Sequence, residues 1–231
     1  MTRIQRHDKF EGVYWIELDD GTKYLGTKNI ARGVRVYDEK LIDYGGDEYR
    51  TWNAYKSKLA GAILKGLKEM PVKEGQKILY LGTSTGTTAS HISDIVGEKG
   101  IIYGVEFAAR VMREFLERCV KYRVNLIPIL ADARDPRSYL DYVEEVDLIY
   151  ADVAQPEQAK ILADNSDFFL RSEGKALLAI KASSIDVTLE PTEVFRREMI
   201  ILEKRGFKVL QMLHLEPYDK DHAMVYLEKE T

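Results

Sequence analysis

The sequence predicts an α/β protein in which a doubly wound, mostly parallel seven-stranded sheet with an antiparallel C-terminal strand follows a small antiparallel β module. From residue 77 onward, apolar runs alternate with helical patterns, which implies parallel strands joined by right-handed crossovers. The last apolar run follows its predecessor too closely for a helical crossover, so it should be antiparallel. Before residue 50, apolar runs flank Asp19-Asp-Gly-Thr22, a hairpin turn signal.

The N-terminal module is expected to span residues 1–50, and the second domain residues 51–231. Within the module, strands are expected at 13–18, 23–26 and 34–37, and the chain is expected to divide near Gly45-Gly46. The next segment, 54–69, has apolar residues at helical spacing, so we predict a helix that Pro71 ends.

The second domain contains the alternating pattern. Its strands are expected near 77–81, 101–105, 124–130, 147–151, 175–180, 207–213 and 223–227. Its helices are expected near 87–96, 108–122, 156–170 and 191–204. Short strands and longer helical segments of this kind are typical of βαβ units.

A glycine-rich turn, Gly82-Thr-Ser-Thr-Gly86, follows the 77–81 strand and leads into a helix start. Gly82 and Gly86 allow backbone geometry and close ligand approach that a Cβ would block. Thr87 and Thr88 offer hydroxyls beside the free N–H groups of the helix N-terminus, and their alternative role is as helix caps. The pattern indicates a cofactor-binding turn.

Three acidic residues, Glu106, Asp132 and Asp152, each come just after an apolar run. Ligands of doubly wound sheets bind outside the carboxyl ends of the strands, so these acids should converge with the glycine turn. Glu106 lies near the offset of about 20 residues at which an acid meets ribose hydroxyls. Because the turn lacks the G-x-G-x-x-G spacing, it fits S-adenosylmethionine, which has a sulfonium and an amino-acid tail, better than a dinucleotide. A nicotinamide-dependent dehydrogenase is therefore disfavoured.

Composition limits the remaining choices. The 231 residues are 45% hydrophobic, enough for a substantial core. No apolar run reaches the roughly 18 residues of a membrane span and the first residues do not form a secretory leader, so we expect a cytoplasmic protein with no membrane partner. The single cysteine excludes an intrachain disulfide framework. The formal charge of −4 disfavours a protein that holds nucleic acid by its own bulk charge.

Several ordered motifs together point to one family. They are Gly82–Gly97, Val105-Glu-Phe107, Asp132-Ala-Arg134, Ala151-Asp-Val-Ala-Gln-Pro156, Ile180-Lys-Ala182, Leu215-Glu-Pro-Tyr218 and Asp221-His-Ala223. With this order the chain closely resembles fibrillarin, the 2′-O-methyltransferase subunit of box C/D guide-RNA particles, over about residues 10–228. It lacks the glycine- and arginine-rich N-terminal extension of eukaryotic forms, so it resembles an archaeal member.

The resemblance implies guide-RNA-directed methyl transfer from S-adenosylmethionine to ribose 2′-hydroxyls of rRNA, with tRNA as a further substrate. It implies four partners: a box C/D guide RNA, its target rRNA, a Nop-type scaffold protein and a kink-turn-binding ribosomal-type protein. Because the guide selects the site by base pairing, the enzyme should recognise ribose and backbone shape. A protein of negative net charge would need such partners to hold RNA.

The resemblance also implies the cofactor contacts. Gly82, Thr87 and Thr88 would surround the methionine part, and Glu106 would bind the ribose. Phe107, Asp132 and Ala133 would contact adenine. The side nearest the methyl group would be closed by Asp152, Val153, Ala154 and Gln155. Phe107 could instead be a core residue, and Asp132 could only cap the turn before Pro136.

Asp152 and Lys181 are candidate catalytic residues because they end adjacent predicted strands and would face one another. The resemblance adds Lys58 and, as a fourth member, His222, which could equally brace the terminal hairpin. Burial lowers the pKa of a lysine and an adjacent carboxylate raises it, so the proton acceptor is left open. We favour Lys181 as hydroxyl activator, Asp152 as its orienting partner and Lys58 as an electrostatic or RNA-phosphate contact.

Two other functions compete with this hypothesis. A small-molecule O-methyltransferase would need a closed pocket and often a metal, but no His, Asp and Glu residues have convincing ligand spacing, and we expect no metal. A catalytically silent scaffold subunit is disfavoured because Asp152, Lys181 and the glycine turn are all present. Ala54, where proline often follows Trp-Asn, and Gly61 depart from the commoner family pattern and leave the geometry around Lys58 open.

Overall fold

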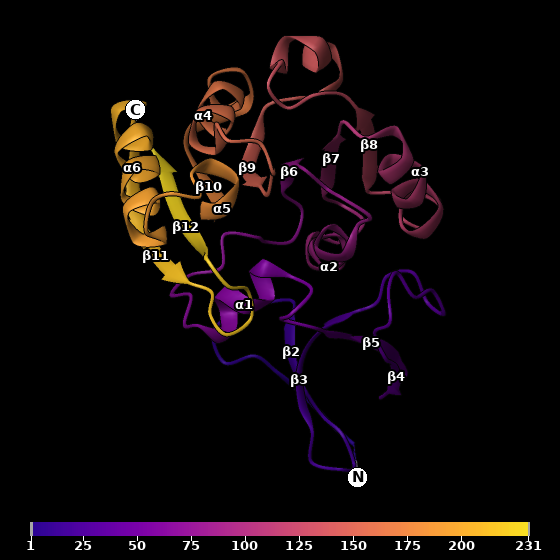
Figure 1. The fold of residues 1–231 in the computed structure, drawn as a ribbon. Helices are drawn as coiled ribbons and strands as arrows, with labels where there is room; N and C mark the ends of the chain where they lie inside the picture. Colours follow the sequence, from indigo (N-terminus) through magenta and orange to yellow (C-terminus); the bar gives the residue numbers. More distant parts are fainter. Residues whose placement is uncertain (1, 231) are drawn as a thin grey trace.

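The computed structural model describes residues 2–230, in which an N-terminal antiparallel sheet lies beside a larger mixed sheet flanked by helices (Figure 1). The small sheet has the order β1-β2-β3-β5-β4, and each neighbouring pair is antiparallel. Its strands are β1 (Arg3–Arg6), β2 (Val13–Glu17), β3 (Lys23–Lys28), β4 (Leu41–Tyr44) and β5 (Asp47–Trp52). The predicted antiparallel module is therefore present.

The strand predicted at 34–37 is wrong, because this segment belongs to no strand. The Glu39 carboxylate accepts the backbone N–H groups of Val36 and Tyr37 at 2.8 Å each, so these donors are bound by a side chain and not by a strand partner. Gly45 and Gly46 form the turn between the paired strands β4 and β5, so the chain does not leave the module there. The division into 1–50 and 51–231 stays a prediction.

The first helix, α1 (Lys58–Leu64), is much shorter than the predicted 54–69. The Asn53 side chain accepts the N–H of Tyr55 at 2.9 Å, which favours a turn over a helix there. Gly66, with a φ of 93°, follows the C-terminus, so Pro71 does not end the helix.

The large sheet has the order β11-β12-β10-β9-β6-β7-β8. Its strands are β6 (Lys77–Leu81), β7 (Ile101–Glu106), β8 (Leu126–Leu130), β9 (Val146–Ala151), β10 (Leu170–Lys181), β11 (Phe207–His214) and β12 (His222–Lys229). The last strand, β12, is antiparallel to both of its neighbours, β10 and β11, whereas the pairs from β10 to β8 are all parallel. The predicted mostly parallel sheet with an antiparallel C-terminal strand is confirmed.

Helices cover both faces of this sheet. They are α2 (Thr87–Val96), α3 (Ala109–Arg118), α4 (Gln158–Phe169), the single turn α5 (Ala182–Ile185) and α6 (Pro191–Lys204), with the 3-10 segments η1 (Val120–Tyr122) and η2 (Pro136–Tyr142). Alternate residues of β6 face opposite cores: Ile78 and Tyr80 pack with α1, α2 and α3, while Leu79 and Leu81 pack with α4 and α6. No helix within residues 2–230 is long and apolar enough to cross a membrane.

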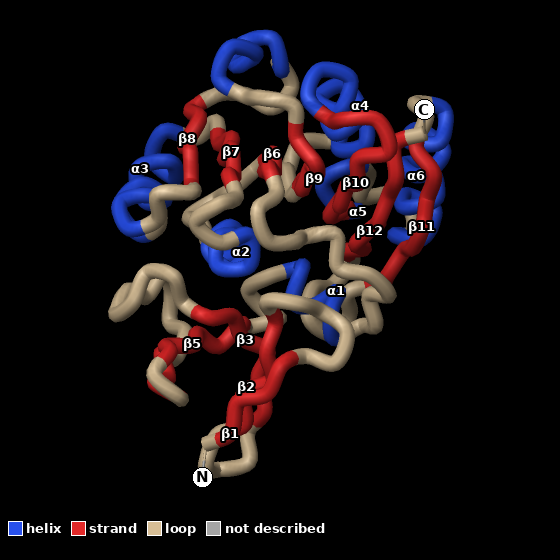
Figure 2. The backbone as a smooth tube through the Cα atoms, turned by 180° about the vertical axis from the view of Figure 1, so that it is seen from behind, coloured by secondary structure: helices blue, strands red, loops and turns tan. Residues whose placement is uncertain are grey.

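The small sheet lies next to α1 and α2, below the large sheet (Figure 2). A network of fully buried ion pairs lies between the two parts. Arg50 of β5 contacts Asp94 of α2 at 2.9 Å across the junction, while Arg50 also contacts Glu39 at 2.8 Å and Asp94 also contacts Arg123 at 2.6 Å. Buried charges of this kind are tolerated only when they are paired and hydrogen-bonded, so the network fixes the module on the second domain.

A buried histidine completes this junction. His91 Nδ1 lies 2.7 Å from the Thr27 hydroxyl, His91 Nε2 lies 2.6 Å from the Tyr37 hydroxyl, and the ring stacks on Trp52. Thr27 donates its one hydroxyl hydrogen to Asp94, so Nδ1 donates to Thr27. The Tyr37 hydroxyl lies within hydrogen-bond distance of both His91 Nε2 and the carbonyl oxygen of Thr51, at 3.0 Å. Burial and the nearby Arg50 and Arg123 hold the pKa of His91 well below its usual value of 6.5.

We expect the free energy of unfolding to fall as the pH drops below about 6.5, because the unfolded chain then protonates His91 and the folded chain does not. His91 should account for up to about 1.4 kcal/mol of this fall in the free energy of unfolding per pH unit. Guanidinium unfolding of the wild type and of His91→Gln between pH 7.5 and 5 measures it. Equal pH dependence in the two proteins would contradict this assignment.

Candidate cofactor and active site

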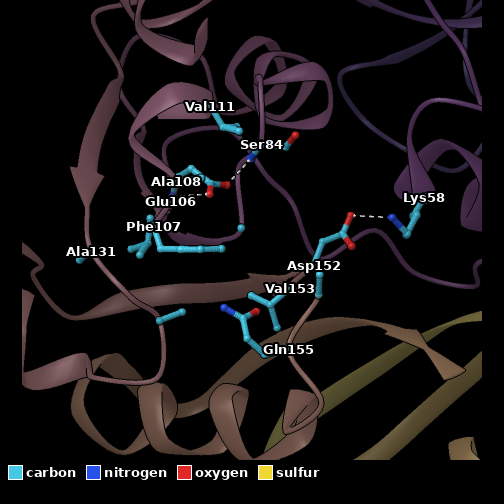
Figure 3. A pocket seen from close by; sticks show the side chains of 14 residues that line it. Lys58, Ser84, Glu106, Phe107, Ala108, Val111, Ala131, Asp152, Val153 and Gln155 are labelled. Carbon is cyan, nitrogen blue, oxygen red and sulfur yellow. Dashed lines mark hydrogen bonds and ion pairs between the residues drawn. The ribbon is translucent and has the colours of Figure 1, made fainter. Parts of the chain in front are cut away.

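A cavity of about 400 Å³ opens at the carboxyl ends of β6, β7 and β9, within the range of small-molecule sites (Figure 3). Most of its lining residues were expected from the sequence: Lys58, Gly82, Glu106, Phe107, Ala133, Asp152, Val153, Ala154 and Gln155. The sequence analysis missed the others, which are Ser84, Val105, Ala108, Val111 and Ala131. Ser84 lies inside the glycine turn and could have been found from that position.

Gly82 is required where the turn crosses the end of β9. Its φ is 80°, and a Cβ on it would lie 2.4 Å from the carbonyl oxygen of Asp152. Any side chain at this position would push apart the turn and the strand end that together form the cavity floor. The glycine therefore provides the backbone geometry that the sequence predicted, while close approach of a ligand stays a prediction.

Glu106 lies at the end of β7 and is buried. Its two carboxylate oxygens accept one backbone N–H each, from Ser84 at 3.1 Å and from Ala108 at 3.0 Å, as Figure 3 shows. Each oxygen retains a second lone pair, so the carboxylate is still able to accept hydrogen bonds from the hydroxyl groups of a ligand. Phe107 is 62% exposed at the cavity, so it is not a core residue.

Two of the expected cofactor contacts, Thr88 and Asp132, have other partners. Thr88 is buried and its hydroxyl lies 2.9 Å from that of Ser57, while the N-cap of α2 is Gly86 and no side chain caps the helix. Asp132 accepts the N–H of Arg134 at 2.9 Å and pairs with its guanidinium, as the turn-capping alternative requires. Thr87, Thr88 and Asp132 do not line the cavity, and their contact with a cofactor stays a prediction.

Lys58 and Asp152 point toward one another at the edge of the cavity (Figure 3), with Lys58 Nζ 3.0 Å from Asp152 Oδ2. Lys58 Nζ also lies 3.7 Å from a carboxylate oxygen of Asp219. Burial lowers the pKa of Lys58, but the two carboxylates outweigh this effect and the net pKa is raised above the ordinary lysine value. Lys58 is therefore an ammonium ion at neutral pH.

Asp219 connects this pair to the histidine. His222 Nδ1 lies 2.9 Å from the Asp219 carboxylate and 2.7 Å from the carbonyl oxygen of Lys220. Burial raises the pKa of Asp219, but the hydrogen bonds and charges of His222 and Lys58 lower it below the usual value, so the carboxylate is ionised. The sequence analysis missed Asp219, although it stands in the polar loop just before His222.

Lys181 ends β10, the strand next to β9, so the predicted adjacency of the two strands that carry Asp152 and Lys181 is confirmed. The backbone of Lys181 pairs with that of His222, and its N–H donates to Gln158 at 2.9 Å. Lys181 and His222 do not line the cavity itself. A direct contact between the Lys181 and Asp152 side chains stays a prediction.

Within residues 2–230, no three His, Cys, Asp or Glu side chains are grouped as a metal site requires. The site instead combines a glycine turn, an acid at the end of β7 and an ionised lysine–carboxylate network at the end of β9. With the antiparallel β12 inserted in the sheet, these features define the methyltransferase class of α/β domains. The chain belongs to the fibrillarin family, whose sequence model matches residues 4–231.

Similar proteins cover nearly the whole chain. The fibrillarin-like rRNA/tRNA 2′-O-methyltransferase of Staphylothermus marinus is 61% identical over 226 residues, 98% of this chain and 96% of that protein. The crystal structure of Aeropyrum pernix fibrillarin with natively bound S-adenosyl-L-methionine is 56% identical, covers 98% of this chain and 99% of its own, and gives a TM-score of 0.92. A fibrillarin/Nop5p complex is 41% identical, with coverages of 97% and 100% and a TM-score of 0.83.

Proposed function

We propose that the protein transfers a methyl group from S-adenosylmethionine to ribose 2′-hydroxyls of rRNA and tRNA, at sites that a box C/D guide RNA selects. The observation that carries this proposal is the Lys58–Asp152–Asp219–His222 network beside the cavity, because it places charged groups next to a site of cofactor size. The similar protein of Staphylothermus marinus is named an rRNA/tRNA 2′-O-methyltransferase, which supports the proposal.

The cavity residues fit S-adenosylmethionine. Gly82 lets the glycine turn pack against the end of β9 at the cavity, Glu106 retains lone pairs for ribose hydroxyls, and Phe107 presents an exposed ring for adenine. Asp152, Val153, Ala154 and Gln155 would line the side nearest the methyl group. The bound cofactor supplies a methyl group on an activated sulfonium, so alignment of the attacking hydroxyl alone contributes about 7–11 kcal/mol.

The chain's own residues would orient the ribose and remove its proton. Lys58 is held protonated by two carboxylates, so it is a poor base and suits the stabilisation of negative charge or an RNA phosphate. We assign the activation of the 2′-hydroxyl to Lys181, with Asp152 orienting both lysines. His222 would act through Asp219, which it holds toward Lys58.

The partners follow from the same proposal. A Nop-type scaffold protein would bind this chain, as Nop5p binds the fibrillarin of the related complex. A kink-turn-binding ribosomal-type protein and the guide RNA would complete the particle with the target rRNA. We place the particle in the cytoplasm, since the named relative is from Staphylothermus, an archaeon, and archaeal cells have no nucleus.

Transfer of a labelled methyl group to a guided rRNA fragment tests the function. We expect one methylated ribose, at the nucleotide that the guide specifies, and no transfer when that nucleotide carries a 2′-deoxyribose. Full labelling of the deoxy substrate would place the methyl group on a base and contradict the proposal. No transfer at all, with normal cofactor binding and assembly, would favour the silent scaffold subunit.

Replacement of Glu106 tests the cofactor assignment. Glu106→Ala removes a charge-assisted hydrogen bond to ribose, typically worth about 1.5–3 kcal/mol, so S-adenosylmethionine should bind roughly tenfold more weakly or worse. Calorimetry measures the affinity. Because Glu106 also holds the N–H groups of Ser84 and Ala108, Glu106→Gln, which keeps one acceptor oxygen, is the matched control and should lose less. Unchanged affinity in both variants would reject the ribose assignment.

A further inference from the structure

An exposed tyrosine lies close along the chain to Lys58 of the Lys58–Asp152–Asp219–His222 network. Tyr55 is 68% exposed and lies three residues before Lys58. Its backbone is fixed in a tight turn, because Asn53 accepts the N–H of Tyr55 through its side chain at 2.9 Å and that of Lys56 through its carbonyl at 3.1 Å. The ring is thus presented to solvent from a defined backbone position.

A second aromatic ring braces it. Tyr218 meets Tyr55 edge to face, with ring centroids 5.2 Å apart and an interplanar angle of 68°. The N–H of Tyr218 is held by the carbonyl of Leu215 at 2.8 Å, and the next residue is Asp219, which contacts Lys58. The tyrosine pair therefore joins the chain segments that carry Lys58 and Asp219.

Gly61 of α1 lies beside Tyr218. A Cβ on Gly61 would lie 3.4 Å from the Cβ of Tyr218, so Tyr218 rests directly against α1 at this residue. The same Cβ would lie 3.7 Å from the carbonyl oxygen of Ala54, the residue before Tyr55. Gly61 and Ala54, the two departures from the commoner family pattern, thus lie next to the tyrosine pair.

We propose that Tyr55, braced by Tyr218, stacks on a nucleobase beside the target ribose of the substrate RNA. This inference rests on the proposed function. Proteins recognise bases splayed from an RNA strand by stacking them on aromatic side chains, and stacking tolerates any base because every base has a π-face. Such tolerance suits an enzyme whose site is chosen by a guide. A chain of net charge −4 also gains from an RNA contact that needs no positive charge.

The test uses the reconstituted particle at guide concentrations at which all of the substrate RNA is bound. Tyr55→Ala should lower the single-turnover methylation rate roughly tenfold, the size expected from loss of one stacked base, while Tyr55→Phe stays near the wild-type rate. Tyr122→Ala, which changes a 46% exposed tyrosine in η1, is the matched surface control and should be unchanged. Affinities for S-adenosylmethionine and for the scaffold protein should be equal in all four proteins.

Abasic substrates identify the stacked base. On RNA with an abasic residue at the target nucleotide or at one neighbour, the wild type should slow to the rate of Tyr55→Ala, and the substitution should then have no further effect. Equal rates for Tyr55→Ala and the wild type on intact RNA, or equal losses in Tyr55→Ala and Tyr55→Phe, would overturn the inference. Weaker scaffold binding by Tyr55→Ala would assign the ring to a protein contact instead. If the wild type does not methylate, the proposed function itself fails.

Discussion

Replacement of Asp152 by alanine is expected to slow single-turnover methylation of a guided RNA by about a hundredfold or more, with little effect on particle assembly. The substitution removes the carboxylate 3.0 Å from Lys58 Nζ and leaves that ammonium with Asp219 alone, at 3.7 Å. It also removes the acid that we assign to orient Lys181, so Lys181→Ala should cause a loss of similar size. Rates measured at saturating cofactor with preassembled particles separate chemistry from binding.

Two variants serve as controls for this result. Asp152→Asn keeps the shape of the side chain but not its charge, so its rate should fall with that of Asp152→Ala if charge is what matters. Asp43→Ala changes a surface aspartate of β4 that pairs with Arg32, and it should behave as the wild type. Near-normal turnover in both Asp152→Ala and Lys181→Ala would rule out this active-site assignment.

The parts of the fold that the sequence predicted well are those that local patterns determine. The helices at 87–96 and 191–204 and the strand at 77–81 have the predicted ends, because glycine, proline and the apolar periodicity act within a few residues. The cavity was predicted for a related reason: parallel strands place their carboxyl ends at one edge of a sheet, so Gly82, Glu106 and Asp152 had to converge.

The errors arise where distant side chains decide the local structure. Glu39 is positioned by a buried ion pair with Arg50 and binds the backbone at Val36 and Tyr37, where apolar alternation had predicted a strand. Asp219 was missed because its partner Lys58 lies near the other end of the chain. The pairing of Asp219 with Lys58 has no signal in the residues beside either of them, so only the tertiary structure reveals it.

The net charge of −4 leads to the prediction with the largest expected effect, which concerns partners. The purified chain should bind S-adenosylmethionine yet methylate RNA poorly, because a protein without a dominant basic surface holds an RNA backbone weakly at physiological salt. Adding the Nop-type scaffold, the kink-turn-binding protein and a box C/D guide should raise the rate by roughly 10²–10⁴, the range that tethering produces without any new catalytic contact.

The test compares the methylation rate of one target RNA by the chain alone with the rate by the reconstituted particle, at the same enzyme and salt concentrations. If tethering is the cause, the particle containing Asp152→Ala should assemble normally and stay slow, since partners raise the local concentration of the substrate ribose but add no catalytic group. Equal, site-specific methylation by the chain alone would defeat the prediction and favour a stand-alone RNA methyltransferase.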